Sequence, residues 1–123
     1  MNILEQTISL NGLRFYAYHG IKAQEAVAGG WYRVNLTIKA DASNTIASDN
    51  IEDTLDYGKA AAIVKEQMEI PSKLIEHLAG KIAKKLIECY GNRLKSVTVT
   101  VIKENPPLGI VCDESTFTLS VEH

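Results

Sequence analysis

The sequence has little net charge, few cysteines and no long apolar run, and each absence excludes a class of protein. Its 13 Lys and Arg residues against 15 Asp and Glu residues leave a net charge of −2. The two signs are interspersed, so no basic footprint for nucleic acid or an anionic membrane is visible. No charged-then-apolar leader opens the chain, and no apolar run approaches the roughly 18 residues of a membrane span. We therefore expect a soluble, cytoplasmic protein without nucleic-acid or membrane partners.

Cysteine is scarce, and its placement does not indicate a metal site. Cys89 and Cys112 lack CxxC spacing and are not grouped with histidines, so no metal ion is expected. Cys89 adjoins the apolar stripe of a predicted helix and is expected to be a small buried hydrophobe. Phosphate-binding glycine loops, dinucleotide fingerprints and nucleophile elbows are absent as well.

The composition that remains is that of an ordinary globular protein. Apolar residues make up 46% of the 123 residues and charged residues 23%. This length suits a single domain spanning residues 1–123, with a modest hydrophobic core.

Two segments in the first third of the chain alternate as β-strands do. Residues 5–18 are predicted to be extended, with a turn or bulge at Asn11-Gly12, where the alternation changes phase. Residues 31–42 alternate most clearly, with one face for the core and one for water. The Gly- and Ala-rich residues between them, 19–31, are predicted to form a loop.

The middle of the chain predicts two helices, and its end predicts two more strands. The first helix covers about 57–69, and the second covers about 73–90, with Ser72 as a possible cap. Gly91-Asn92 ends the second helix. Strands are predicted at 95–103 and 116–122.

This order, strand–strand–helix–helix–strand–strand, predicts the fold class. Segregated strands and helices indicate an α+β fold, here a four-stranded antiparallel sheet with two helices on one face. Such a sheet has two open edges, and long apolar edge strands favour pairing with neighbouring subunits. A homo-oligomer is therefore expected.

Lys103 is the polar residue with the strongest local signal. Val97, Val99 and Val101 occupy one face of a predicted strand, and Lys103 is the next residue on that face. Its ammonium group either extends to water or lies at the floor of a pocket. A desolvated lysine suits acid–base chemistry near neutral pH, and the following Asn-Pro-Pro stiffens the end of the strand.

Other polar residues allow two interpretations each. Glu76, in the first turn of the second helix, is either a surface carboxylate or the rim of a cavity, where it could bind a flat heterocycle through two parallel N–H donors. Glu25 is either solvated or close to a ligand in a loop of small residues. Tyr57 either packs with its hydroxyl outward or exchanges a proton. His19 and His77 have no spaced metal partners and are expected to be structural.

Four segments together resemble the dihydroneopterin aldolase family of folate biosynthesis. They are LRFYAYHGIKAQEAVAGGWYRV (13–34), DTLDYG (53–58), LIEHLAGKIA (74–83) and IKENPPLG (102–109). The resemblance implies the tunnelling fold, with the ββααββ order predicted above. It also implies four subunits closing a barrel, two barrels stacking as an octamer, and active sites between neighbouring subunits.

The resemblance also implies roles for particular residues. Glu76 would grip the amino group and a ring N–H of the pterin, and the backbone of Ile75 would line the same end. Glu25 would approach the reacting side of the substrate. Lys103 would act as general acid or base, and Tyr57 would come from the adjoining subunit.

The implied reaction is a retro-aldol cleavage of dihydroneopterin to hydroxymethyl-dihydropterin and glycolaldehyde. The pterin ring accepts the electrons, so neither a metal nor another cofactor is implied. Two alternatives stay open: an epimerase acting on dihydroneopterin or its triphosphate, and a pterin-binding protein without catalysis. The chain departs from the family pattern at 108–111, Leu-Gly-Ile-Val, which follows the two prolines.

Overall fold

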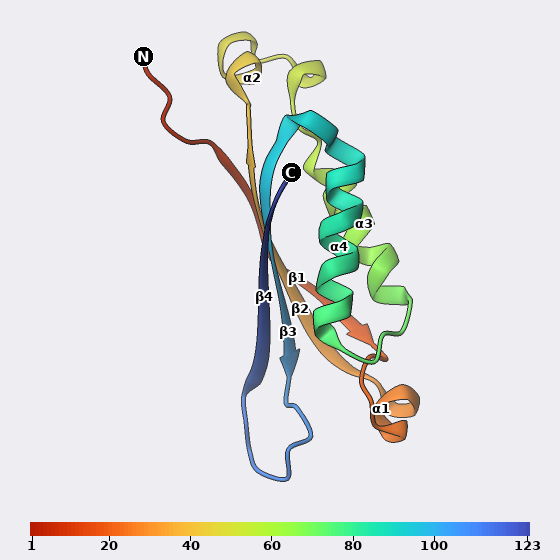
Figure 1. Ribbon diagram of the computed structural model, residues 1–123. Helices are drawn as coiled ribbons and strands as arrows, with labels where there is room; N and C mark the ends of the chain where they lie inside the picture. The colour runs from red at the N-terminus through yellow and green to blue at the C-terminus, as the bar shows by residue number, and fades with distance from the viewer.

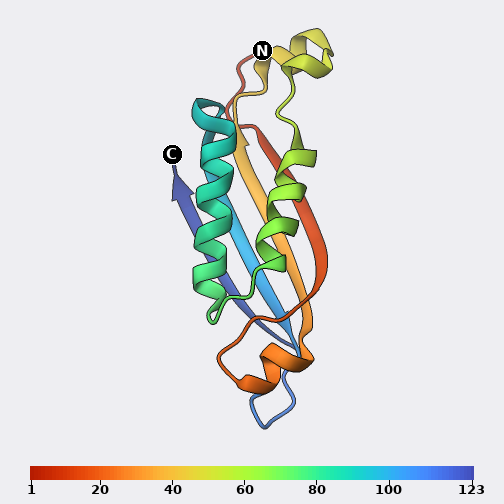
Figure 2. The ribbon, with the colours of Figure 1, turned by 90° about the vertical axis from the view of Figure 1, so that its right-hand side faces the viewer.

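The computed structural model, which describes residues 1–123, consists of one twisted antiparallel sheet with two helices packed on one face (Figures 1 and 2). The strand order β1-β2-β3-β4 follows the sequence. The strands are β1 (Thr7–Ala17), β2 (Gly30–Ala40), β3 (Leu94–Glu104) and β4 (Glu114–Glu122), and the packed helices are α3 (Tyr57–Glu69) and α4 (Ile75–Tyr90). The predicted fold class is confirmed.

The bulge predicted in the first strand is present. The register of β1 against β2 shifts between Leu10 and Leu13. Gly12 adopts a φ of 74°, and its N–H donates to Oδ1 of Asn35 at 2.6 Å. Glycine enters this left-handed region without the steric cost of a Cβ, so the phase change in the sequence marks a real change of register.

The segment 19–31 is not the plain loop that the sequence predicted. It contains the short helix α1 (Ala23–Ala28). The backbone N–H of Lys22 donates to Oε1 of Glu25 at 3.3 Å, a local bond that the composition of the segment did not reveal. The connection after β2 likewise contains α2 (Ser43–Ser48) and the 3-10 turn η1 (Ile51–Asp53). A second 3-10 turn, η2 (Gly91–Arg93), follows α4.

Two predictions about single residues were wrong. Ser72 does not cap α4, because the helix begins at Ile75 after Leu74, which makes no side-chain capping bond. Cys89 is exposed rather than buried, because the last turn of α4 runs beside an open hollow.

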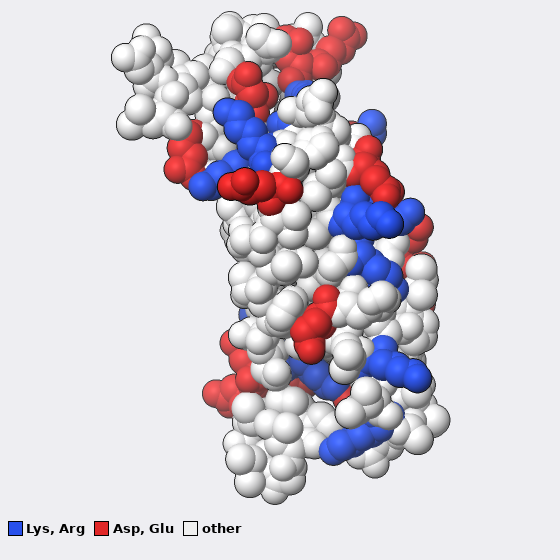
Figure 3. Space-filling view, in the orientation of Figure 1, with Lys and Arg blue, Asp and Glu red and all other residues white.

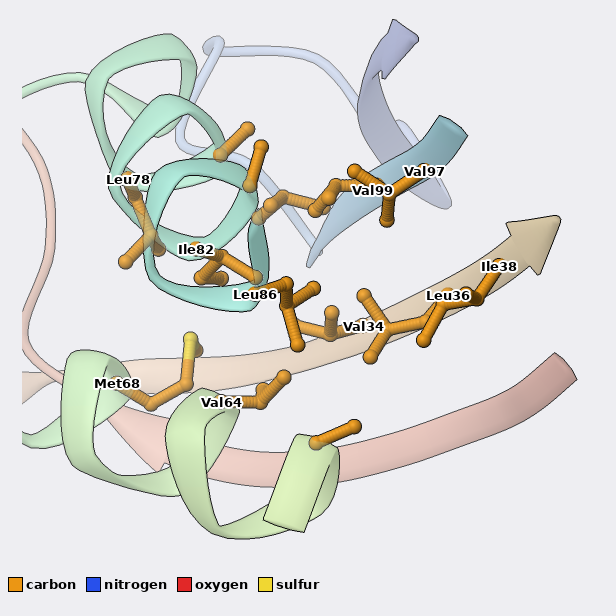
Figure 4. Packing of buried hydrophobic residues seen from close by; sticks show 14 of the residues in the cluster. Val34, Leu36, Ile38, Val64, Met68, Leu78, Ile82, Leu86, Val97 and Val99 are labelled. Carbon is orange, nitrogen blue, oxygen red and sulfur yellow. The ribbon is translucent and has the colours of Figure 1, made fainter. Parts of the chain in front are cut away.

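The core lies between the helices and the facing side of the sheet (Figure 4). Its most completely buried members are aliphatic, as the alternation and the helical stripe predicted. They include Val34, Leu36, Ile38, Val64, Leu78, Ile82, Leu86, Val97 and Val99. Val101 is the last buried valine of the row on β3, so Lys103 follows directly at the end of a buried apolar face.

The other face of the sheet is polar and carries no helix. Cross-strand hydroxyl pairs line it, among them Thr98 with Ser120 at 2.9 Å and Thr100 with Thr118 at 3.1 Å. The outer edges of β1 and β4 have no strand partner. None of the helices is long and apolar enough to cross a membrane.

Removing core volume at the centre of β2 should destabilise the protein strongly. Leu36→Ala should lower the free energy of unfolding by about 2–5 kcal/mol, because Leu36 is fully buried. Urea denaturation followed by circular dichroism would measure it. Lys39→Ala, at an exposed site on the same strand, is the control and should change it by less than about 1 kcal/mol. Equal losses in the two variants would contradict this placement of the core.

Candidate functional site

The polar residues singled out from the sequence gather mainly at one end of the molecule, the lower end in Figure 1. There the end of β3, the start of β2, α1 and the start of α4 meet. A cavity of about 280 Å³ lies between α1, the start of β2 and the end of β3. Its polar wall is formed by His19, Gln24, Glu25, Tyr32, Lys103 and Glu104. Figure 3 shows that acidic and basic side chains are interspersed over the face seen there, without a large field of one sign.

Lys103 and Glu25 form an ion pair in the wall of this cavity. Nζ of Lys103 donates to Oε2 of Glu25. Their side chains are only 18% and 12% exposed. Lys103 faces Tyr32 across the β2–β3 pair, and Nζ lies 5.9 Å from the centre of the Tyr32 ring. The lysine at the end of the valine row therefore lines a pocket instead of extending to water.

The pair holds Glu25 in its ionised form. Burial by itself raises the pKa of Glu25, but the hydrogen bond from Lys103 and the backbone N–H of Lys22 outweigh it. The net result is a pKa below the ordinary value of a glutamate. At neutral pH the cavity therefore contains a carboxylate against an ammonium group.

The local backbone is shaped to bring Glu25 into this position. Gly20 has a φ of 132°, and a Cβ there would lie 2.5 Å from the carboxyl carbon of Glu25. Only glycine leaves room for the carboxylate against the chain. Nζ of Lys22 donates to the carbonyl of Pro107 at 2.7 Å, which joins the start of α1 to the loop after β3.

His19 is buried in the same wall, with 1% of its surface exposed. Its Nδ1 accepts the N–H of Ser72 at 2.9 Å, and its ring lies edge-on to Tyr32. Burial, with the charges of Lys81 and Lys103, lowers the pKa of His19 to about 4. The histidine is neutral at physiological pH, as a structural histidine should be.

Tyr32 connects His19 to the ion pair, and neither sequence motif nor periodicity marked it as part of a site. Its hydroxyl donates to the backbone carbonyl of His19 at 2.9 Å. Burial, assisted by the negative charge of Glu25, raises the pKa of Tyr32 to about 12, so the hydroxyl keeps its proton. The alternation of β2 placed Tyr32 in the core, and only the pairing with Lys103 shows its second role.

Glu76 and Ile75 begin α4 at the same end of the molecule. Glu76 is exposed and has no hydrogen-bond partner within the chain. The backbone N–H groups of Ile75 and Glu76 have no acceptor either, as at any helix start. A carboxylate beside free N–H donors can bind the donor and acceptor edge of a flat heterocycle.

Tyr57 is not brought to this cavity. It begins α3 beside the last turn of α4, where the hydroxyl of Tyr90 donates to the carbonyl of Asp56. Glu76 lies at the first turn of α4, so the length of that helix separates them by roughly 20 Å. Tyr57 is 58% exposed and lines a different hollow, of about 570 Å³, with Thr54 and Arg93 among its other walls.

The fold and this charged cavity are those of a small α+β protein whose polar site lies at the ends of its central strands. The family follows from comparison with known proteins. The dihydroneopterin aldolase family model matches residues 8–120. The dihydroneopterin aldolase of Staphylococcus epidermidis is 44% identical over 106 residues, which are 85% of this chain and 87% of that one. The chain belongs to the dihydroneopterin aldolase family, which confirms the family recognised from the motifs and its enzyme class, a carbon–carbon lyase.

Solved structures agree on the fold. The Escherichia coli dihydroneopterin aldolase in complex with neopterin superposes with a TM-score of 0.85 at 16% identity, covering 94% of this chain and 98% of that one. The Burkholderia thailendensis dihydroneopterin aldolase bound to guanine gives a TM-score of 0.77 at 17% identity, with 97% and 92% covered. The roles of individual residues remain predictions.

The buried His19 should make stability depend on pH. Its pKa is about 4 in the folded chain and 6.5 ordinarily, so the unfolded state binds the proton first as the pH falls. The contribution is complete above pH 6.5 and is lost between pH 6.5 and 4, by about 3 kcal/mol.

Urea denaturation at a series of pH values would measure this loss. His19→Asn cannot titrate and should show a flatter dependence over the same range. Parallel curves for the two proteins would mean that His19 is not the group responsible.

Proposed function

We propose that the Lys103–Glu25 pair, the anchor Glu76 and Tyr57 of an adjoining subunit carry out the retro-aldol cleavage of dihydroneopterin. The products are hydroxymethyl-dihydropterin and glycolaldehyde. The single observation that carries these roles is the position of the ion pair, at the end of a fully buried valine row and in the wall of a cavity. A charged pair in such a place has a cost in desolvation that a solvated surface pair does not have.

Glu76 acts as the anchor in this proposal. Its exposed carboxylate accepts the amino group and a ring N–H of the pterin as two parallel bonds. The free N–H of Ile75 is available to a ring acceptor on the same edge. The neopterin and guanine held by the two relatives both carry this amino-pyrimidinone edge, which supports the same use of it here.

Lys103 and Glu25 act at the reacting end. The side-chain hydroxyl next to the breaking carbon–carbon bond passes its proton to water and becomes the carbonyl of glycolaldehyde. The electron pair of that bond moves into the C=N of the ring, where the Lys103 ammonium stabilises the charge at the ring nitrogen. Glu25, held ionised, keeps the ammonium in place. The carbon left behind then takes a proton, a step assigned to Lys103 with Tyr57.

The position of Tyr57 supports a site shared between subunits. Within one chain it lies at the far end of α4 from the anchor, too distant to touch the same small substrate. The unpaired edges of β1 and β4 offer a route for assembly. An apolar groove beside β4, lined by Ala83, Ile87, Leu119 and Val121, would be covered in such a contact. We propose the octamer of two stacked tetramers expected for this family.

Epimerisation of the same substrate would use the same residues, with recombination on the other face. The cavity contains Lys103 as its lining cation, and this ammonium is already paired with Glu25. That favours an unphosphorylated substrate over a triphosphate. Both cysteines are free, which supports a reducing cytoplasm as the location.

Substitutions should separate anchoring from chemistry. Lys103→Ala should lower kcat by about 10²–10⁴-fold while leaving neopterin affinity within a few-fold, because it removes an acid–base group. Glu76→Ala should weaken neopterin binding by about 10–100-fold, because a charged bidentate contact is lost. Steady-state kinetics and calorimetry would measure both, with Lys39→Ala as a surface control. Normal turnover by Lys103→Ala would remove that residue from the mechanism.

Mixed oligomers should reveal whether the site is shared. Inactive Lys103→Ala and Tyr57→Phe proteins, unfolded together at equal amounts and refolded, should regain about a quarter of wild-type activity if each site takes one residue from each of two subunits. Each variant refolded alone provides the baseline. If the mixture stays at that baseline, Tyr57 does not act across a subunit boundary.

A further inference from the structure

His19 is a buried polar residue that the proposed chemistry leaves unused. Its Nδ1 accepts a hydrogen bond from the Ser72 backbone, so the neutral ring carries its proton on Nε2. That Nε2–H is buried, and its contact with the Met68 backbone does not meet hydrogen-bond geometry. A buried donor without an acceptor destabilises the folded state. A phenylalanine or leucine of similar size would fill the same space without that loss of stability.

The bonds around His19 join three segments of the chain. The imidazole accepts the N–H of Ser72, and the next residue, Gly20, donates its N–H to the Ser72 carbonyl at 2.9 Å. The carbonyl of His19 accepts the hydroxyl of Tyr32. The connection between α3 and α4 is thereby tied to the end of β1 and to the strand that faces Lys103.

The two halves of the proposed substrate site are carried by the two segments that meet at this junction. The chain after His19 leads through Gly20 into α1 and Glu25. The chain after Ser72 leads into α4, where Glu76 occupies the first turn. Two hydrogen bonds connect these segments directly: the Ser72 N–H donates to the His19 imidazole, and the Gly20 N–H donates to the Ser72 carbonyl.

We propose that His19 is a positioning residue that sets the separation between the anchor Glu76 and the Lys103–Glu25 pair, through its bond to the Ser72 N–H. The inference rests on the proposed function of those three residues. It assigns to His19 no contact with the substrate. A substrate that spans both halves depends on their separation, whereas a ligand that touches the anchor alone does not.

Two variants and two ligands test this inference in the whole 123-residue chain. His19→Leu fills similar space without an acceptor, and His19→Asn retains an acceptor near the position of Nδ1. Guanine contains the amino-pyrimidinone edge without a reacting side chain, so its affinity reports the anchor. His19→Leu should lower kcat for dihydroneopterin by about tenfold or more, because small misplacements of reacting groups have large effects on rate. Guanine affinity should stay within about threefold, since the anchor itself is intact.

Rescue distinguishes positioning from general destabilisation. His19→Asn should return kcat to within about threefold of wild type, because the Ser72 N–H again has an acceptor. Val64→Ala, a core change in α3 away from these bonds, is the control for lost stability. It should leave both kcat and guanine affinity unchanged at temperatures where the variant is folded.

The outcomes separate this inference from the proposed function. If wild type cleaves dihydroneopterin and His19→Leu does so equally well, the positioning role is wrong and the aldolase assignment stands. If His19→Leu loses turnover and guanine binding in equal proportion, its effect is structural and the inference again falls. If wild type cleaves nothing, the proposed function fails, and the affinity ratio of neopterin to guanine decides the role of His19. If His19→Leu lowers this ratio and His19→Asn restores it, the positioning role is supported. If neither variant changes the ratio, the positioning role is wrong.

Discussion

The ion pair between Lys103 and Glu25 is the interaction on which the organisation of the site depends. Two charged side chains that are less than a fifth exposed must be matched closely, because removing either would leave an uncompensated charge. The surroundings of the pair meet that need. Gly20 leaves space for the carboxylate, Lys22 supports it through a backbone N–H, and Tyr32 presents its ring to the ammonium.

The core and the site are continuous in this small chain. The valine row of β3 is buried because α4 packs over it. Lys103 is the next residue on that face, so the row also fixes the position of Lys103. α4 in turn begins at the same end of the molecule, so the helix that buries the core also presents Glu76, the proposed anchor. The bulge at Gly12 keeps the apolar face of β1 toward this core on both sides of the change of register. The elements that build the core therefore also hold the ion pair and the proposed anchor.

The residues of the proposed site lie at two opposite ends of the chain's long helix α4. The proposed anchor Glu76, the ion pair and the buried His19 lie at one end of the molecule, whereas Tyr57 lies at the other, beyond the length of α4. Two side chains hold the segment before Tyr57 in place. The guanidinium of Arg93 donates to the carbonyls of Asp53 and Thr54, and the hydroxyl of Tyr90 donates to the carbonyl of Asp56. This well-supported segment with an exposed tyrosine is consistent with the proposal that Tyr57 completes the site of a neighbouring subunit.

The sequence by itself determined the strands, the two long helices and the family. Alternation and helical periodicity are local records of which face is buried, so they are readable without a structure. It also placed Lys103 at the end of an apolar row. The tertiary structure alone decided the partner of that lysine, the helix α1 that presents Glu25, and the exposure of Cys89. It also decided that Ser72 bonds to His19 through its backbone instead of capping α4. The partner of Lys103 and the bond of Ser72 depend on contacts between residues 78 and 53 positions apart. The exposure of Cys89 depends on the hollow beside the last turn of α4. No periodic pattern in the sequence records these features.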